Sequence, residues 1–332
     1  MKAISLFSGG LDSILATRLI ADQGIDVEAL YFKTIFWGKY DDTLNNSLLN
    51  NVAYQAKARL SIFEAGEDYF DVVKNPEHGY GKNLNPCIDC KVFILKKAKE
   101  YMRANDASFL ITGEVLGQRP MSQHRSVLNT IENASATSGI IVRPLSAKLF
   151  KASIPEDRGW INRDKFFALQ GRSRKPQIAL AKRFGIEGFP NPAGGCLLAD
   201  RAFSGKMRDI IKHEKDSQAN DISLIKNGRV FRLSPKTKLV VGRDEKQNSL
   251  LLDLVRDMDY SFSTLGIPGP VGIGRGAFDE DTIHAAAGIV ARYSDSTPGS
   301  KVSILYKKHP GIGEKSIDVM PATEDSLSSL RV

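Results

Sequence analysis

The motif SGGLDS at residues 8–13 constrains the fold of this chain more than any other feature of its sequence. It follows a short apolar run, Ala3 to Phe7, that predicts a buried strand, and a helical pattern begins near Leu11. Two adjacent glycines let the backbone turn tightly and bring its N–H groups close to an anion, and the following helix directs its positive end at the same place. The motif therefore predicts a phosphate cradle made by Ser8, Gly9, Gly10 and Ser13.

The residue after the turn distinguishes this cradle from the common P-loop. A P-loop carries Gly-Lys-Ser/Thr after its glycines, whereas Leu11, Asp12 and Ser13 occupy that space here. Because no lysine is present to neutralise a terminal phosphate, we expect Asp12 to hold Mg²⁺ on a pyrophosphate that leaves. Asp12 is thus predicted to be both a cofactor-binding and a catalytic residue.

Further apolar runs predict the sheet to which this motif belongs. They lie at residues 27–32, 60–64, 109–112 and 140–142, and segments of helical spacing or composition separate them. Alternating strands and helices predict an α/β fold, a doubly wound parallel sheet covered on both faces. Ligands of such sheets bind beyond the carboxyl ends of the strands, where the glycine turn lies.

The pattern changes after Pro144, which predicts a chain of two domains. We expect a first domain over residues 1–203, with a basic helical extension at 146–203, and a smaller α+β domain over 204–332. In the second domain the pattern predicts helices at 206–213 and from 247, and strands at 229–233 and 238–241. A Gly/Pro-rich loop is expected at 267–276 and a loose tail over the last ten residues.

Three further motifs lead to a family resemblance. They are NPCIDCK at 85–91, TGEVLGQRPMSQ at 112–123 and NPAGGCLLAD at 191–200. SGGLDS resembles the signature of the PP-loop ATP pyrophosphatases, and the four motifs together resemble the tRNA-thiolating branch of that family. The resemblance implies an adenine nucleotide alpha hydrolase-like sheet, cleavage of ATP between its α and β phosphates, and adenylation of a substrate oxygen.

The stretch TGEVLGQ is similar to the corresponding part of tRNA 4-thiouridine synthases. The resemblance implies that Gly113 lets the backbone approach the nucleotide and that Gln118 offers it a side-chain amide, as Gln123 could also do. A second interpretation is a helix start in which Glu114 and Gln118 have structural roles.

The chain has three cysteines, Cys87, Cys90 and Cys196, too few for a secreted disulfide framework. Three thiolates brought together by folding could hold a [4Fe–4S] cluster with one iron lacking a protein ligand, and such an iron could bind sulfide. The arrangement resembles cluster-dependent tRNA thiolases. Cys90 and Cys196 also resemble the paired catalytic cysteines of tRNA 2-thiouridylases, a persulfide relay that leaves Cys87 without a role. Zinc binding and three unlinked buried cysteines stay open as further alternatives.

The charge of the chain is concentrated in one segment. Residues 140–208 carry 14 Lys/Arg against 5 Asp/Glu, which accounts for the whole formal excess of +8. Such a stretch is typical of a polyanionic partner, and Arg172, Arg174 and Lys175 are the predicted RNA-binding residues, although a merely solvated face would look the same. Residues 225–255 resemble small RNA-binding domains found in thiouridylase-like proteins and ribosome-quality-control factors.

These observations predict a cytoplasmic, ATP-dependent tRNA sulfurtransferase that uses ATP, Mg²⁺ and a [4Fe–4S] cluster. Sulfur is expected from inorganic sulfide or from a cysteine desulfurase or persulfide carrier. No apolar run approaches the roughly 20 residues that span a bilayer. The rival functions are a PP-loop ligase or amidotransferase acting on a small molecule, and a non-catalytic RNA-binding protein. Uridine 8 or 34, C2 or C4 chemistry, and monomer or homodimer are left open.

Overall fold

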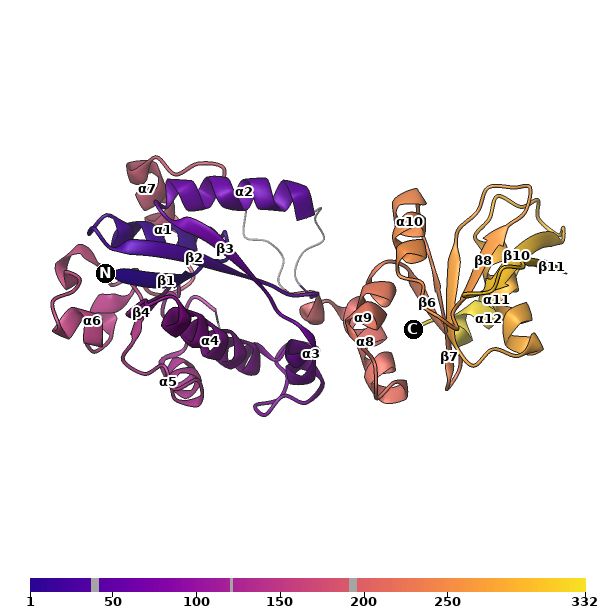
Figure 1. Cartoon of the computed structure of the whole chain (residues 1–332), viewed down its shortest axis with the longest axis horizontal. Helices are drawn as coiled ribbons and strands as arrows, with labels where there is room; N and C mark the ends of the chain where they lie inside the picture. The colour runs from indigo at the N-terminus through magenta and orange to yellow at the C-terminus, as the bar shows by residue number, and fades with distance from the viewer. Residues whose placement is uncertain (37–41, 120–121, 191–195) are drawn as a thin grey trace. The chain divides into compact units, whose positions relative to one another are not determined.

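The computed structural model describes residues 1–36, 42–119, 122–190 and 196–332. The chain divides into two compact units, Met1–Asp200 and Arg201–Val332, called unit 1 and unit 2 below (Figure 1). The boundary predicted between residues 203 and 204 lies inside helix α8 (Arg201–His213), with which unit 2 begins.

Over the described residues, unit 1 holds a five-stranded, wholly parallel sheet in the order β3-β2-β1-β4-β5. The strands are β1 (Lys2–Leu6), β2 (Asp26–Lys33), β3 (Arg59–Glu64), β4 (Phe109–Thr112) and β5 (Ile141–Val142). They coincide with the five apolar runs of the sequence, because strands buried on both faces are apolar throughout. The predicted doubly wound α/β fold is confirmed for unit 1.

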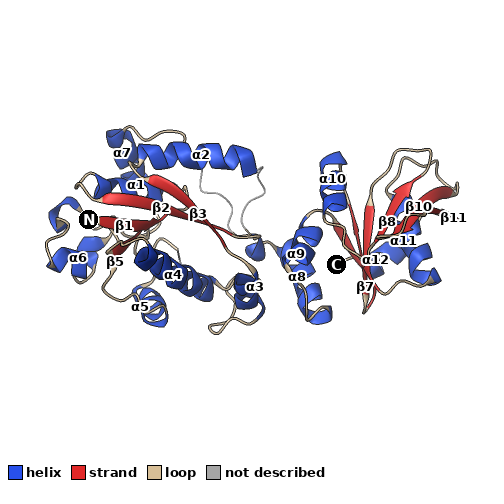
Figure 2. Cartoon of the chain, viewed as in Figure 1, coloured by secondary structure: helices blue, strands red, loops and turns tan. Residues whose placement is uncertain are grey.

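Helices cover both faces of this sheet (Figure 2). One face carries α1 (Leu11–Ala21), α2 (Asp42–Gln55) and α7 (Lys175–Phe184), and the other carries α3 (Glu67–Lys74), α4 (Cys87–Ala104) and α5 (Arg125–Ala134). Alternate strand residues serve the two layers: Ala29 packs with Leu15 of α1, and its neighbour Leu30 packs with Leu95 of α4. The first residues of α1 and α4 therefore lie on opposite sides of the sheet.

The basic extension of unit 1 is less helical than predicted. Besides the short helix α6 (Ile154–Asp157) and the 3-10 turns at 147–149, 163–165 and 197–199, its described residues as far as Asp200 form only α7. Gly171 has a left-handed φ of 82°, which ends any helix there, and Pro176 in the first turn of α7 starts a new one. The extended stretch before α7 runs beside the TGEVLGQ loop, since Leu116 and Gln170 form a bridge and Gly171 N–H donates to Leu116 O at 2.8 Å.

All of unit 2 is described, and its six strands form one antiparallel sheet in the order β11-β10-β8-β9-β7-β6. The strands are β6 (Arg229–Ser234), β7 (Thr237–Val241), β8 (Tyr260–Thr264), β9 (Gly272–Gly276), β10 (Val302–Lys308) and β11 (Lys315–Val319). Its helices are α8, α9 (Ala219–Lys226), α10 (Glu245–Asp253), α11 (Glu280–Arg292) and α12 (Glu324–Leu330). The core combines the sheet with α11 and α12, so the predicted smaller α+β domain is confirmed.

Two predictions for unit 2 are wrong. The Gly/Pro-rich stretch at 267–276 is not a loop throughout, because its second half is the central strand β9. Gly272 and Gly274 leave space for neighbouring side chains there. A Cβ added to Gly272 would stand 2.7 Å from Val290, and one added to Gly274 would stand 2.3 Å from Phe278. The last ten residues are not a loose tail either, since α12 buries Leu327 completely in the core.

Candidate nucleotide and thiol site

The SGGLDS loop forms a braced turn between β1 and α1. Ser13 Oγ donates to Gly10 O at 2.8 Å and accepts from Ser8 N–H at 3.2 Å, so the serines at the two ends of the motif hold each other. Gly9 has a left-handed φ of 70°, a conformation in which a side chain is strained. In the first turn of α1, Ser13 and Ile14 N–H donate to Gly10 O at 3.0 and 3.2 Å, whereas the N–H groups of Leu11 and Asp12 have no acceptor within the helix. This first turn follows the carboxyl end of β1. The loop therefore has the features of an anion cradle.

Asp12 is joined to the TGEVLGQ loop and to α7 by a chain of hydrogen bonds. Gln118 Nε2 donates to Asp12 Oδ2 at 2.8 Å, and Gln177 Nε2 donates to Gln118 Oε1 at 3.3 Å. The second oxygen of Asp12, Oδ1, is buried and has no hydrogen-bond partner among the described residues. Both Asp12 and Gln118 thus belong to one site, whereas sequence reasoning missed Gln177.

Gly113 lies against the start of α1. A Cβ at this position would stand 2.5 Å from the backbone carbon of Asp12 and 2.5 Å from the nitrogen of Ser13. The glycine lets the loop after β4 touch the phosphate loop itself, a contact different from the approach to nucleotide that the resemblance implies. Gln123, a side chain expected to face the nucleotide, is buried and its Oε1 accepts from Arg119 N–H at 3.0 Å.

Glu114 connects the TGEVLGQ loop to helix α4, which begins at Cys87 and contains Cys90. Its carboxylate pairs with Lys91 of α4 and accepts from Arg143 Nε at 2.9 Å, and Arg143 also pairs with Glu132 of α5. Burial would raise the pKa of Glu114, but the charges of Lys91 and Arg143 hold this pKa at about 2. Glu114 therefore has the structural role that was the second interpretation of this stretch, while Gln118 faces Asp12.

The three cysteines share an environment around Tyr69 of α3. Tyr69 is 2% exposed and its hydroxyl donates to Cys90 Sγ at 3.0 Å. After burial itself, the nearby thiols of Cys90, Cys196 and Cys87 raise the pKa of Tyr69. All three thiols are free and partly buried, and burial raises the pKa of Cys90 to about 11 and that of Cys196 to about 12. The fold thus brings Cys196 to the Cys-x-x-Cys pair that opens α4, while residues 191–195 of its motif lie outside the described residues.

The spacing of the thiols bears on which metal they suit. Four sulfurs on one zinc ion at about 2.3 Å each lie within about 4 Å of one another. In the described part of the chain, the one set of three His, Cys, Asp or Glu side chains whose ligand atoms all lie within 4.8 Å is Glu77, His78 and Asp89. The three cysteine sulfurs therefore do not all lie within 4.8 Å of one another, a wider spacing than ligation of one small ion requires.

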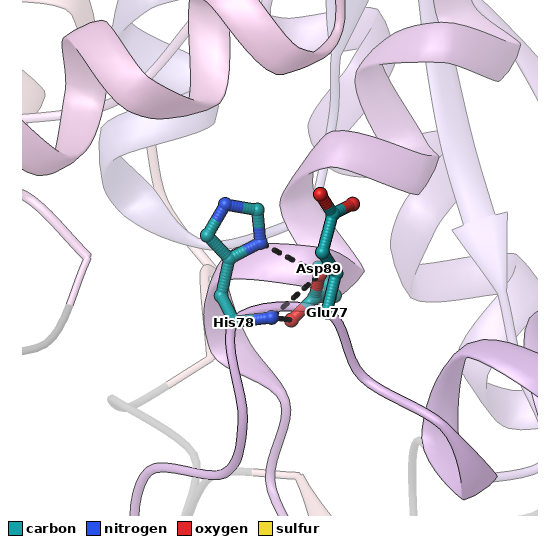
Figure 3. Close-up of side chains that lie close together, drawn as sticks. All are labelled: Glu77, His78 and Asp89. Carbon is teal, nitrogen blue, oxygen red and sulfur yellow. Dashed lines mark hydrogen bonds and ion pairs between the residues drawn. The ribbon is translucent and has the colours of Figure 1, made fainter.

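Figure 3 shows the Glu77, His78 and Asp89 group, which lies beside the cysteines because Asp89 stands between Cys87 and Cys90. The Asp89 carboxylate accepts from the backbone N–H of His78 at 3.1 Å and faces His78 Nδ1 at 2.9 Å. Both contacts are internal to the protein and fix the loop before α4. The contacts between Asp89 and His78 therefore hold this loop against the first turn of α4.

The predicted RNA-binding residues lie at the start of α7. Arg172 and Lys175 are exposed, whereas Arg174 is half-buried, and its Nε is buried without a hydrogen-bond partner in the described residues. Arg174 also has no ion pair there. The three residues therefore differ in environment, although the sequence places them together.

A second basic group, which sequence reasoning missed, surrounds Tyr293 in unit 2. The Arg229 guanidinium lies 4.4 Å from the centre of the Tyr293 ring, and Arg331 donates to the Tyr293 hydroxyl at 2.9 Å. Burial, followed by repulsion from Arg243 and Arg331, lowers the pKa of Arg229. Arg229, Arg243 and Tyr293 line one pocket. No sequence signal unites them, because they come from β6, the β7–α10 turn and the end of α11.

Two family models match this chain. Residues 1–154 match the family described as thiamine biosynthesis protein (ThiI), and residues 228–331 match the family described as NFACT protein RNA binding domain. None of the helices in the described part of the chain has the length and apolar character that crossing a bilayer requires.

Curated proteins and solved structures give further similarities. The tRNA-specific 2-thiouridylase MnmA of Marinomonas sp. is 23% identical over 244 residues, which are 70% of this chain and 57% of that protein. A probable tRNA sulfurtransferase of Methanosarcina mazei is 28% identical over 127 residues, 35% of this chain and 29% of that protein. A 4-thiouridine synthetase solved with RNA and ATP is 20% identical, covers 56% of this chain and 41% of its own, and gives a TM-score of 0.41.

The chain thus spans 57% of the length of the Marinomonas thiouridylase and 29% of that of the Methanosarcina sulfurtransferase. The resemblance to the PP-loop ATP pyrophosphatases of the tRNA-thiolating branch, predicted from the motifs, is confirmed by the matches of unit 1.

Proposed function

We propose that this protein catalyses the ATP-dependent thiolation of a uridine in tRNA. The observation that carries the proposal is the combination, in one unit, of a braced phosphate loop with Asp12 at its end and three free cysteines gathered around Tyr69. The matches to thiolating relatives support it. Unit 2 supports a macromolecular substrate, because its matched family is an RNA-binding domain and Arg229, Arg243 and Arg331 lie around Tyr293.

The first half of the proposed reaction takes place at the phosphate loop. Ser8, Gly9, Gly10 and Ser13 bind the β and γ phosphates of ATP, and Asp12 holds Mg²⁺ on them. A uridine carbonyl oxygen attacks the α phosphorus, the bond to the bridging oxygen breaks, and pyrophosphate leaves with the electron pair. The fixed N–H groups and the cation stabilise the charge that develops on the leaving group.

In the second half, sulfur replaces AMP at the activated carbon, with C–S bond formation and C–O cleavage. Cys87, Cys90 and Cys196 fit a [4Fe–4S] cluster by their number and their ligand chemistry, and when bound it would supply an iron without a protein ligand at which sulfide is held. Tyr69 donates a hydrogen bond to Cys90 Sγ and so orients that side chain. Sulfide or a persulfide carrier is the proposed donor, and the cytoplasm, where tRNA is found, is the proposed location.

A persulfide relay between Cys90 and Cys196 is the second candidate, favoured by the match to 2-thiouridylases. The two mechanisms differ in Cys87, which only the cluster requires. Cys87→Ser is expected to abolish iron binding and thiolation but to leave adenylation intact. Normal thiolation by this variant with a persulfide donor and no iron would establish the relay instead.

The proposed function is tested by pyrophosphate release with and without bulk tRNA, followed by mass spectrometry of the tRNA nucleosides. Release that depends on tRNA, together with a thiolated uridine, is the expected result. Release without tRNA would indicate a ligase for a small molecule, and no release would indicate a non-catalytic RNA-binding protein.

A further inference from the structure

The segment before and at the start of α7 is built into the phosphate site. Gly171 N–H donates to Leu116 O, and Gln177 donates to Gln118, which in turn contacts Asp12. Behind these contacts, Leu180 and Ala181 of α7 pack with Leu11 and Leu15 of α1. The first turn of α7 is thus held at the first turn of α1 by both polar and apolar contacts.

Unsatisfied polar atoms collect along this connection. Five buried side-chain N or O atoms in the described residues have no hydrogen-bond partner, and three of them are Asp12 Oδ1, Gln177 Oε1 and Arg174 Nε. Gln177 is 1% exposed, so solvent does not serve its free oxygen. Buried polar groups are nearly always paired, and a group of such exceptions indicates a ligand that is needed to complete the site.

The chemistry of these atoms restricts the ligand. Two are acceptors, which need a cation or a donor such as the water of a hydrated Mg²⁺, and one is a cationic donor, which needs an anion. A magnesium pyrophosphate group presents both at once. Neither Mg²⁺ alone nor a neutral base would satisfy the Arg174 guanidinium, which forms no ion pair with any described residue.

We propose that the first turn of α7 completes the nucleotide site: Arg174 binds a phosphate oxygen of the pyrophosphate part of ATP, and Gln177 positions Asp12 through Gln118. The inference rests on the proposed function, because it takes ATP as the ligand of the phosphate loop. It gives Arg174 a role different from the RNA contact expected from the sequence. Arg172 and Lys175, which are exposed, stay available for other partners.

The test is a calorimetric titration of the full chain with magnesium pyrophosphate, without tRNA. Arg174→Gln is expected to weaken binding by about tenfold or more, as the loss of a charge-assisted contact to phosphate predicts. Arg174→Lys should retain part of the affinity. Arg172→Gln, which removes the same charge two residues away, is the matched control and should change the dissociation constant by less than about twofold.

The role of Gln177 is tested by a double-mutant cycle with Gln118→Leu and Gln177→Leu. Because the two side chains act through one hydrogen bond on Asp12, each is expected to raise the Mg²⁺ concentration needed for half-maximal pyrophosphate binding, and the double variant should add little. Thermal unfolding followed by tryptophan fluorescence separates this from a loss of fold. Additive effects, or effects seen only in stability, would show that Gln177 is merely structural.

The outcomes separate this inference from the proposed function. If the unaltered chain does not bind magnesium pyrophosphate, both are overturned. If it binds and Arg174→Gln leaves affinity unchanged, or Arg172→Gln weakens it equally, the inference alone is overturned. If Arg174→Gln leaves the affinity for pyrophosphate unchanged but lowers the affinity for tRNA, Arg174 contacts RNA and not the nucleotide.

Discussion

Asp12 has one carboxylate oxygen in use and one free. Gln118 donates to Oδ2, so the side chain is held in place, and Oδ1 is buried without a hydrogen-bond partner in the described residues. A carboxylate fixed in this way can accept a cation without first rearranging. The position of the residue is therefore set by its neighbours, and its charge remains for a ligand.

Asp12→Asn should preserve this position and remove only the charge, because the amide oxygen can still accept from Gln118. We expect tRNA-dependent pyrophosphate release to fall by roughly a hundredfold or more, since a metal contributes several kcal/mol to charge stabilisation. The melting temperature and tRNA affinity should be unchanged. Undiminished, magnesium-dependent release by this variant would contradict the assignment of Asp12 as the metal ligand.

Gly113 has a steric role that can be tested against Gly10. A Cβ on Gly113 would stand 2.5 Å from α1 backbone atoms, whereas among the described residues a Cβ on Gly10 meets only Ser8 Oγ, at 3.4 Å. Gly113→Ala is therefore expected to destabilise unit 1 by about 1–3 kcal/mol, as overpacking does. Gly10→Ala should unfold at nearly the wild-type urea concentration. Equal stability of both variants would show that the loop after β4 can move away.

At the scale of elements, Glu114 ties together the loop after β4, helix α4 and strand β5. Its two cationic partners, Lys91 and Arg143, come from α4 and from the end of β5. The TGEVLGQ loop and helix α4 are thus joined by a largely buried ionic contact. Removing the charge of Glu114 takes the partner from Lys91, whose side chain is 24% exposed, while Arg143 keeps its pair with Glu132.

Glu114→Gln is expected to destabilise unit 1 by about 1.5–3 kcal/mol at pH 7, the contribution of hydrogen bonds to charged groups. The folded-state pKa of about 2 lies below the ordinary value of about 4.3, so the stabilisation is complete above about pH 4.5 and is lost as the pH falls toward 2. The difference between the two proteins should shrink over that range. Urea unfolding followed by tryptophan fluorescence reports unit 1 alone, since Trp37 and Trp160 both precede residue 201.

Glu64→Gln is the control for this measurement. Glu64 pairs with Lys33 at 3.2 Å, but its side chain is 73% exposed, and such pairs contribute at most about 1 kcal/mol. A Glu114→Gln effect no larger than that of the control, or independent of pH, would contradict the ionic role of Glu114.

An element could be predicted from the sequence where the interactions that determine it are local in the chain, and not where they join residues far apart in the sequence. The strands of unit 1 were predictable because burial on both faces makes each one a continuous apolar run. Strand β9 was not predictable from the sequence. Its glycines are required because the side chains of Phe278 and Val290 lie against them, and only the folded structure brings these residues together. Likewise SGGLDS indicates its own turn, whereas the contact of Tyr69 with Cys90 and that of Gln177 with Gln118 join separate elements.

At the scale of the whole molecule, basic residues occur in both units, and tRNA binding can distinguish them. We predict that Arg229→Gln with Arg243→Gln in the full chain lowers the slope of log affinity against log salt by about 1 to 2, because each lost phosphate contact releases about one counterion fewer. Fluorescence anisotropy of labelled tRNA over a range of salt concentrations measures this slope.

The exposed pair Lys301 and Lys315 in the same unit provides the matched loss of charge, and its double Gln variant should leave the slope nearly unchanged. If the Arg229 and Arg243 variant behaves like this control while Arg172→Gln with Lys175→Gln flattens the slope, the phosphate contacts lie just before and at the start of α7 in unit 1, as the sequence predicts.

The central place of β1 in the sheet of unit 1 also affects the order in which the chain can assemble during synthesis. The ribosome makes β1 before the other four strands, and β2 and β3 then add outward on one side and β4 and β5 on the other. Each new strand therefore meets an edge that already exists. β4 pairs with β1 only after about a hundred residues have been made, so the side of β1 that receives β4 stays unpaired for that time and is where a nascent chain is exposed to mispairing.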